Sequence, residues 1–379
     1  MPTPSDSFNT VYISRTALQH NYQALQSLVG PGVRLLPMIK SDAYGHGLVE
    51  TAKMLSEAGA DAFGVAEVDE GVRLREAGIK GQVFVFLGSY CFAALIDYGL
   101  TPVVFDLANI KEMSAYAEGY GKTVGVHLKV DTGMGRLGVM PDEVESYIDQ
   151  IEKLPGVYLS GLLSHFPMAD QPESPKTREQ NLLFDRLAKE VGFTGCGSKG
   201  VCHIANSAAI LKAPVTHHGM VRPGISLYGC SPLTEALDRR NISLKPVMSF
   251  ATKIVQLKNV PAGYGVSYGH LFKTSRPSRL AILPVGYADG YLRCLTGRAE
   301  VLIRGRRAPV CGRVCMNATV VDVTDIPDAQ VLDEAVVMGP QTYHEFAGEI
   351  TADEVAGWMG TISYEVLCLF GNSNQRVYC

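Results

Sequence analysis

The sequence predicts an α/β fold: an N-terminal (β/α)8 barrel of the TIM type, followed by a C-terminal mainly-β domain. From residue 33 to 230, short continuous apolar runs alternate with amphipathic stretches, as in parallel strands that are buried on both faces and separated by helices. After about residue 240, strand-like runs are joined by Gly- and Pro-containing turns, with few helical stretches before about 351. We therefore expect a barrel over 1–240 and a β domain over 241–379, with the N-terminal end, to about residue 10, associated with the β domain.

Eight apolar runs are candidate barrel strands. In chain order they cover 33–40, 61–66, 82–88, 101–106, 123–131, 157–166, 200–207 and 219–228. Helical segments separate most of them, and the clearest helices are expected at 48–59, 68–78, 142–154 and 176–191. An open doubly wound sheet is the alternative, but no G-x-G-x-x-G motif follows a first strand, so we favour the barrel.

The composition excludes several classes of function. The 379 residues carry a net charge of only -4, so there is no basic surplus to hold a nucleic acid. No apolar run reaches the roughly 18 residues of a membrane span, and the N-terminus does not resemble a signal peptide. The nine cysteines are irregularly spaced, which favours free thiols in a reducing cytoplasm. Cys311 and Cys315 have no second pair nearby, so we expect no metal site.

Reactive residues of a (β/α)8 barrel gather at the carboxyl ends of its strands. Lys40 is the sharpest candidate, because a desolvated lysine there can lose its proton and bind an aldehyde covalently. A surface lysine at a strand end is an equally good interpretation from position alone. Arg222 precedes Pro-Gly and could hold a phosphate or a pyridine nitrogen, or could simply pair with a carboxylate. Further polar residues end other predicted strands: Lys129, Asp131, His165, Asn206 and Ser207.

These side chains also have ordinary structural explanations. A histidine alone on an apolar strand, like His165, is more often a core residue than a catalyst. Asn206 and Ser207 could be helix caps. Tyr268, in the glycine- and tyrosine-rich segment 263–269, would by itself most often be a packing residue.

Taken together, the motifs closely resemble those of bacterial alanine racemases. The resemblance runs from about residue 9 to the C-terminus, and its eight blocks occur in the family's order: IKSDAYGHG, VDTGMGRLG, HIANSAA, RPGISLYG, GVSYG, PVGYADGY, GRVCMN and TISYEVLC. It implies a pyridoxal-phosphate enzyme that interconverts L- and D-alanine and supplies D-alanine for peptidoglycan. It also implies a homodimer with shared active sites.

The resemblance implies a role for each matching residue. Lys40 would carry pyridoxal phosphate and act as one base, and Tyr268 would be the second base, reaching the partner subunit's site. Arg222 would bond the pyridine nitrogen, with His165 between Arg222 and Tyr268. The cofactor phosphate would be held by Tyr44, Ser207, Gly224, Ile225 and Tyr364, and Asn206 belongs to the same cofactor-binding set.

The substrate carboxylate would be bound by Arg136, near the phenolic oxygen of the cofactor, and by the backbone amide of Met316 from the partner subunit. Lys129 matches a position that is carbamylated in some members and then steadies Arg136. One block departs from the family: CMNA stands where many members have CMDQ, so Asn317 replaces a carboxylate near the substrate. We expect this change to affect substrate preference and to leave catalysis in place.

Three other functions compete with this interpretation. A racemase of serine or another small amino acid would have the same fold and cofactor. An amino-acid decarboxylase uses a similar barrel, but the racemisation base Tyr268 argues against it. A non-catalytic pyridoxal-phosphate carrier would lack the large β domain.

Overall fold

The computed structural model describes residues 7–88, 90–171, 174–193, 200–233 and 242–379, and these form two units. The barrel unit comprises the described residues of Leu18–Ala43 and Leu48–Lys245. The β unit comprises the described part of Met1–Ala17, together with Tyr44–Gly47 and Pro246–Cys379. The boundary expected between 240 and 241 lies outside the described residues.

Parallel strands form a closed ring in the barrel unit, which is the predicted fold class. Six pair in chain order: β3 (Ala62–Val65), β4 (Gln82–Val85), β5 (Thr101–Val104), β6 (Val124–Lys129), β7 (Val157–Leu163) and β8 (Val201–His203). A separate pair consists of β2 (Arg34–Leu35) and β9 (Met220–Val221). Single parallel bridges, Met38 to Gly64 and Asn206 to Arg222, join the two sheets.

The first and last strands are shorter than the sequence predicts. The run 33–40 contributes only β2 and a bridge at Met38, and the run 219–228 contributes β9 before a 3-10 helix at Ile225–Tyr228. Pro37 and Pro223 explain the difference, because proline has no N–H to donate to a strand ladder. Lys40 therefore does not end a strand but begins the turn that follows it.

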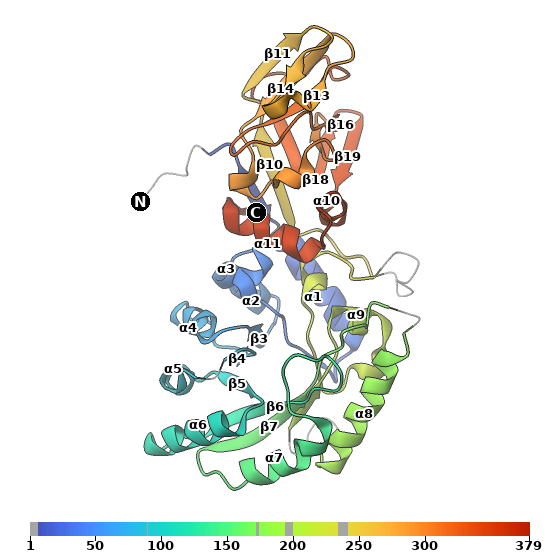
Figure 1. Ribbon diagram of the computed structural model, residues 1–379. Helices are drawn as coiled ribbons and strands as arrows, with labels where there is room; N and C mark the ends of the chain where they lie inside the picture. Colours follow the sequence, from blue (N-terminus) through green and yellow to red (C-terminus); the bar gives the residue numbers. More distant parts are fainter. Residues whose placement is uncertain (1–6, 89, 172–173, 194–199, 234–241) are drawn as a thin grey trace. The chain divides into compact units, whose positions relative to one another are not determined.

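Helices follow the strands and cover the outer side of the sheet (Figure 1). The predicted helices are present with slightly different ends, as α3 (Leu48–Glu57), α4 (Val68–Glu76), α7 (Val144–Ile151) and α8 (Lys176–Glu190). Further described helices are α1 (Arg15–Val29), α5 (Phe92–Asp97), α6 (Leu107–Gly119) and α9 (Ser207–Lys212), and the label α2 marks the short left-handed turn Lys40–Tyr44. Local capping sets some of these starts: the Asp106 side chain accepts the backbone N–H of Asn109 at the beginning of α6.

The β unit is built on a seven-stranded sheet. Its strands are β16 (Arg306–Pro309), β15 (Glu300–Ile303), β18 (Glu334–Tyr343), β10 (Met248–Lys253), β1 (Thr10–Ile13) and β20 (Gln375–Tyr378), with β19 (Phe346–Ile350) beside β18. The N-terminal strand β1 pairs antiparallel with β10 and parallel with β20. A second sheet holds β11 (Gln256–Val260), β14 (Ser278–Leu283) and β17 (Thr319–Asp322). A hairpin of β12 (Gly265–Val266) and β13 (Phe272–Lys273), and helices α10 (Ala352–Met359) and α11 (Ser363–Ser373), complete the unit.

Two expectations from the composition can be compared with the described residues. The eight described cysteines are free thiols, but only Cys202, Cys230 and Cys311 are buried; Cys196 lies outside the described residues. In the described part of the chain, no helix is both long and apolar enough to cross a membrane.

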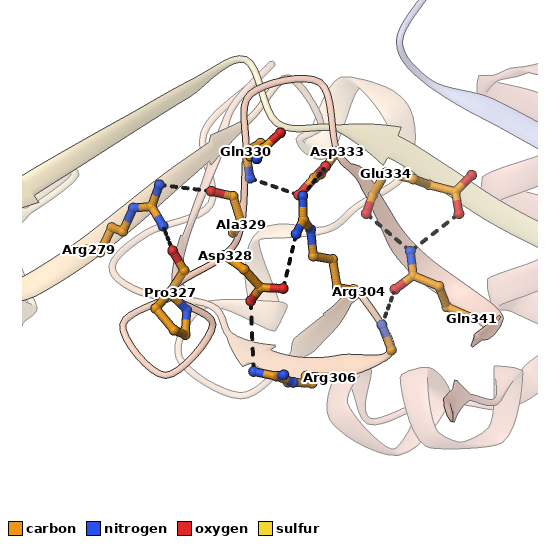
Figure 2. A network of polar contacts seen from close by, with 11 residues as sticks. Arg279, Arg304, Arg306, Pro327, Asp328, Ala329, Gln330, Asp333, Glu334 and Gln341 are labelled. Atoms are coloured by element: carbon orange, nitrogen blue, oxygen red, sulfur yellow. Dashed lines mark hydrogen bonds and ion pairs between the residues drawn. The ribbon is translucent and has the colours of Figure 1, made fainter. Parts of the chain in front are cut away.

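An arginine network ties the loop between β17 and β18 to the β unit (Figure 2). The side chain of Arg304 is only 11% exposed and binds Asp333 through both Nε (2.6 Å) and Nη2 (3.2 Å). It also binds Asp328 through Nη1 at 3.0 Å. Arg279 donates to the carbonyls of Pro327 and Ala329. Bidentate pairs of this kind, shielded from water, are stronger than exposed ion pairs.

We expect Arg304→Ala to lower the free energy of unfolding by about 2 kcal/mol, because it removes both hydrogen bonds of Arg304 to Asp333 and leaves Asp328 with Arg306 alone. Arg276→Ala is the matched control, since Arg276 pairs with Asp325 while both side chains are more than half exposed. Its loss should cost less than about 1 kcal/mol. Urea unfolding measures both variants, and equal destabilisation would show that the Arg304 network contributes no more than a surface pair.

Candidate active site

Lys40 begins a turn of left-handed backbone. The next four residues, Ser41–Tyr44, have φ values of 54°, 53°, 56° and 53°, and none is glycine. A left-handed conformation costs about 1–2 kcal/mol per residue with a Cβ and is rarely adopted by consecutive residues. Gly45 (φ 84°) and Gly47 (φ 90°) continue the turn and have no such cost. Strain of this kind is concentrated at functional sites, where surrounding contacts maintain it.

Glu70 supplies such contacts from the first turn of α4. Its carboxylate is buried, and Oε1 accepts the backbone N–H of Ser41 at 2.6 Å and of Asp42 at 3.4 Å. The other oxygen, Oε2, accepts the N–H groups of Ala66 and Glu67 at 2.8 and 3.2 Å. One side chain thus connects the turn after Lys40 to the end of β3. Glu70 was not identified from the sequence, where it reads as an ordinary acidic residue near a helix start.

Arg222 is a buried cation whose hydrogen bonds, within the described residues, go to carbonyls and histidines. Nη1 donates to Nδ1 of His203 at 2.8 Å and to the His203 carbonyl at 2.9 Å. Nη2 donates to the carbonyls of Ser164 (2.6 Å) and Ile204 (3.1 Å), and lies 3.3 Å from Nδ1 of His165. Burial lowers the pKa of Arg222 to about 9, which leaves it charged at neutral pH. No described residue accepts its Nε–H, which could donate to a bound group.

A chain of neutral histidines extends from Arg222 into the barrel core. Since arginine can only donate, Nδ1 of His203 accepts and its Nε2 carries the proton. That proton faces Nδ1 of His127 at 2.9 Å. Burial, and then the charges of Arg34 and Arg222, lower the pKa of His127 to about 3. Neither histidine could be identified from the sequence, because a histidine in an apolar strand is indistinguishable from a core residue.

His165 lies among four cationic side chains of the barrel unit. Its pKa is lowered well below the ordinary value, mainly by burial and further by the charges of Arg222, Lys129, Arg136 and Lys40. His165 is therefore neutral, with Nδ1 facing Arg222. The structure thus places four residues that were singled out from the sequence around a fifth, His165.

Lys129 is a buried lysine, 6% exposed, at the end of β6. Burial, and then the charges of Arg222, Arg136 and Lys40, lower its pKa to about 8, while Asp131 opposes the shift. The amine is still mostly charged at neutral pH, but its uncharged, nucleophilic form is far more populated than in an ordinary lysine.

Asp131 shapes the loop that carries Arg136. Its carboxylate accepts backbone N–H groups of Gly133, Met134, Gly135 and Arg136 at 2.7–3.1 Å. Burial raises the pKa of Asp131, but these four donors outweigh it and lower the pKa overall. The Arg136 side chain is exposed in this chain.

The segments after β8 and β9 meet through Ser207. Its Oγ accepts the backbone N–H of Gly224 at 2.9 Å and that of Ser226 at 3.4 Å, and Ile225 begins the 3-10 helix between them. Asn206 is the N-cap of α9, with Oδ1 accepting the N–H of Ala209. Its helix-cap interpretation is thus correct, whereas its cofactor role stays a prediction.

The remaining candidate residues belong to the β unit. Tyr44 and Tyr364 are neighbours there, with ring centroids 6.0 Å apart. Burial, and then Tyr364 and Cys368, raise the pKa of Tyr44, so it stays a neutral hydroxyl. Tyr268 and Met316 are exposed, at 69% and 55%, on segments that touch each other.

The barrel-unit residues fit the cofactor that the sequence motifs imply. Pyridoxal phosphate is an anion with an aldehyde and a pyridine nitrogen. The unit offers a lysine next to a strained turn, a buried arginine with a spare donor, and a cluster of cations. Arg222 has carbonyl and histidine acceptors, but the described residues provide no carboxylate to balance its charge. A buried cation is costly without a counter-charge, which an anionic cofactor would supply.

The buried histidines make the barrel unit acid-sensitive. Because the folded-state pKa of His127 lies near 3 instead of about 6.5, only the unfolded chain binds its proton as pH falls. Proton binding to this histidine in the unfolded chain lowers the free energy of unfolding. The loss is absent above about pH 6.5 and grows by about 1.4 kcal/mol per pH unit down to about pH 3. We expect His127→Asn, which keeps an acceptor for His203, to flatten the fall in unfolding free energy between pH 6.5 and 5. Denaturant unfolding at several pH values measures this, and an unchanged slope would contradict it.

Comparisons with known proteins follow the same division of the chain. Residues 13–232 match the family model "Alanine racemase, N-terminal domain", and residues 247–378 match "Alanine racemase, C-terminal domain". Alanine racemases of Desulfosudis oleivorans and Desulfovibrio desulfuricans are 41% and 40% identical, over 97% of this chain and 95% and 96% of theirs. The crystal structure of alanine racemase from Streptomyces lavendulae has a TM-score of 0.89 at 35% identity, covering 100% of this chain and 98% of that one. The alanine racemase of Clostridium difficile 630 has a TM-score of 0.90 at 32% identity, covering 99% and 97%.

Proposed function

This chain belongs to the alanine racemase family, and we propose that it interconverts L- and D-alanine with pyridoxal phosphate, using Lys40 and Tyr268 as its two bases. It is an isomerase of the amino-acid racemase type. Within the chain, the observation that carries the proposal is the group of cations Lys40, Lys129 and Arg222 around neutral His165. Such a cluster suits an anionic cofactor and an amino-acid carboxylate.

Lys40 would hold the cofactor covalently, and Arg222 would donate its Nε–H to the pyridine nitrogen. When bound, pyridoxal phosphate spreads the negative charge left after the α-proton departs. Arg222 keeps its own proton, so it would leave the pyridine nitrogen unprotonated and thereby disfavour side reactions. The proposed phosphate ligands are the Ser207 hydroxyl, the backbone around Gly224 and Ile225, and the hydroxyls of Tyr44 and Tyr364.

Racemisation needs one base on each face of the α-carbon, because the proton removed from one face must be replaced from the other. Lys40 would serve one enantiomer and Tyr268 the other. Tyr268 is 69% exposed within its own chain, which suits a side chain that acts in a partner's site. We therefore propose a homodimer with shared sites, in which Met316 supplies its backbone amide to the partner's substrate.

Arg136 would bind the substrate carboxylate, and Lys129 would steady it as a carbamate. The lowered pKa of Lys129 supports this modification, because only an uncharged amine reacts with carbon dioxide. The carbamate is anionic and would attract the guanidinium of Arg136. Asp131 supports the same arrangement by organising the backbone of that loop.

Supply of D-alanine to peptidoglycan is the role that family membership suggests, with cytoplasmic location supported by the eight free thiols. Preference among small amino acids depends on how crowded the substrate space is. Asn317 is exposed next to Met316 and would lie near the substrate, so a serine racemase is the alternative.

A chiral product assay tests the function. The protein, supplied with pyridoxal phosphate, is incubated separately with L-alanine and D-alanine, and with L-serine, L-glutamate and L-lysine in parallel. Approach to a racemic mixture fastest with alanine, from both sides, supports the proposal. A faster reaction with serine would change the substrate and keep the bases, whereas carbon dioxide release without inversion would identify a decarboxylase.

A further inference from the structure

The residue before Tyr268 has a backbone conformation that glycine alone usually adopts. Ser267 has φ 59° and ψ −171°, which is unfavourable for any residue with a Cβ. The Tyr268 side chain is largely exposed, so packing within this chain does little to orient it. Its position therefore depends on the backbone, and the backbone depends on whatever holds Ser267.

The hydroxyl of Ser267 is held by the segment that leads to Met316. Oγ donates to the Arg313 carbonyl at 2.7 Å and lies 3.3 Å from Sγ of Cys315. The two segments are also pressed together at Gly312, where a Cβ would lie 2.6 Å from the carbonyl oxygen of Val266. A glycine at 267 would adopt the same φ without strain. Serine at this position is strained, but it supplies the hydroxyl that binds the Arg313 carbonyl.

The segment that receives the hydroxyl is itself fixed. The carbonyls of Cys315 and Met316 accept the backbone N–H groups of Tyr287 (3.1 Å) and Ala288 (3.0 Å). Gly286 approaches these carbonyls so closely that a Cβ there would overlap both oxygens. The Ser267 hydroxyl therefore connects the backbone of Tyr268 to an anchored segment that also carries Met316.

We propose that Ser267 is the positioning residue for Tyr268: its hydroxyl holds the strained backbone that aims the phenol at the α-carbon. This rests on the proposed role of Tyr268 as one of two bases. Loss of the hydroxyl should slow only the proton transfers made by Tyr268 and leave those made by Lys40 unchanged.

The steady-state rates alone do not reveal this asymmetry. L- and D-alanine have equal free energies, so any variant must lower kcat/KM equally in both directions. The useful measurement is exchange of the α-proton in deuterated water, with recovered substrate and product separated on a chiral column and analysed by mass spectrometry. When Tyr268 is slow, a proton taken by Lys40 exchanges with solvent and returns to the same face, which labels the substrate before inversion.

Ser267→Ala and Ser267→Gly form the test pair, because both lose the hydroxyl but only the glycine variant loses the strain. We expect kcat/KM to fall about tenfold in each, the factor for one typical hydrogen bond. The ratio of labelled substrate to product should rise about tenfold for one enantiomer only. That enantiomer should be the one whose ratio of labelled substrate to product also rises in Tyr268→Phe.

Ser278→Ala is the matched control. Ser278 also lies in the β unit, where it is buried, and its hydroxyl likewise donates to a backbone carbonyl, that of Arg276, at 2.9 Å. We expect it to keep the parent labelling ratio. A ratio that rises for both enantiomers or neither, or a glycine variant with parent behaviour, would overturn the proposal. A parent protein that neither inverts nor labels alanine would instead refute the proposed function, before any variant is compared.

Discussion

Lys40→Ala is expected to abolish racemisation, with a fall of more than roughly 10⁴-fold in kcat/KM. A positioned base contributes roughly 10²- to 10⁴-fold, and this side chain would also hold the cofactor, so both functions are lost together. The chiral assay measures the rate. Reduction with borohydride followed by mass spectrometry measures whether the cofactor can still be fixed to the protein.

Two further variants distinguish the amine of Lys40 from its charge. Lys40→Arg keeps a cation in place but cannot give up its proton or form the covalent link, so it should be as inactive as the alanine variant. Lys53→Ala removes an exposed lysine of the same unit, which pairs with Glu50 across one helical turn, and should retain the parent rate. Substantial activity in Lys40→Arg would assign Lys40 an electrostatic role and contradict the two-base proposal.

Tyr268→Phe is expected to lower kcat/KM by roughly 10²- to 10⁴-fold in both directions, because it removes the hydroxyl and keeps the ring. The α-proton of one enantiomer should still exchange with deuterated water, since Lys40 remains. The matched control is Tyr264→Phe, which removes a hydroxyl from a 44% exposed tyrosine of the same loop. A parent rate in Tyr268→Phe, or loss of exchange from both enantiomers together, would falsify the role of Tyr268 as one of two independent bases.

The contacts around the left-handed turn explain why local sequence patterns misplace Lys40. Apolar periodicity through 33–40 predicts a strand that ends at the lysine, whereas β2 ends at Leu35. Nothing local favours left-handed backbone at Ser41 or Asp42. Glu70, which accepts their N–H groups, is far away in the sequence and on another helix. Local propensity is a weak guide where a distant carboxylate offsets the cost of strain.

The histidines show a second limit of pattern reading. His165 was considered because it ends a predicted strand, and it does lie among cations. His203 and His127 occupy equally apolar strands, and their relation to Arg222 depends on which strands are neighbours and in what register. The hydrogen-bond chain from Arg222, just after β9, to His203 in β8 and His127 in β6 is therefore visible only after the barrel has closed.

The fold class, the order of strands and helices, and the identity of the motif residues could be predicted from the sequence, because they follow from hydrophobic periodicity and from short blocks along the chain. Tertiary structure decided what surrounds those residues. It set the strained turn held by Glu70, the lowered pKa values of Lys129 and His165, and the tie between Ser267 and Arg313. The physical reason is that desolvation, backbone strain and hydrogen bonding depend on atoms brought together from distant parts of the chain.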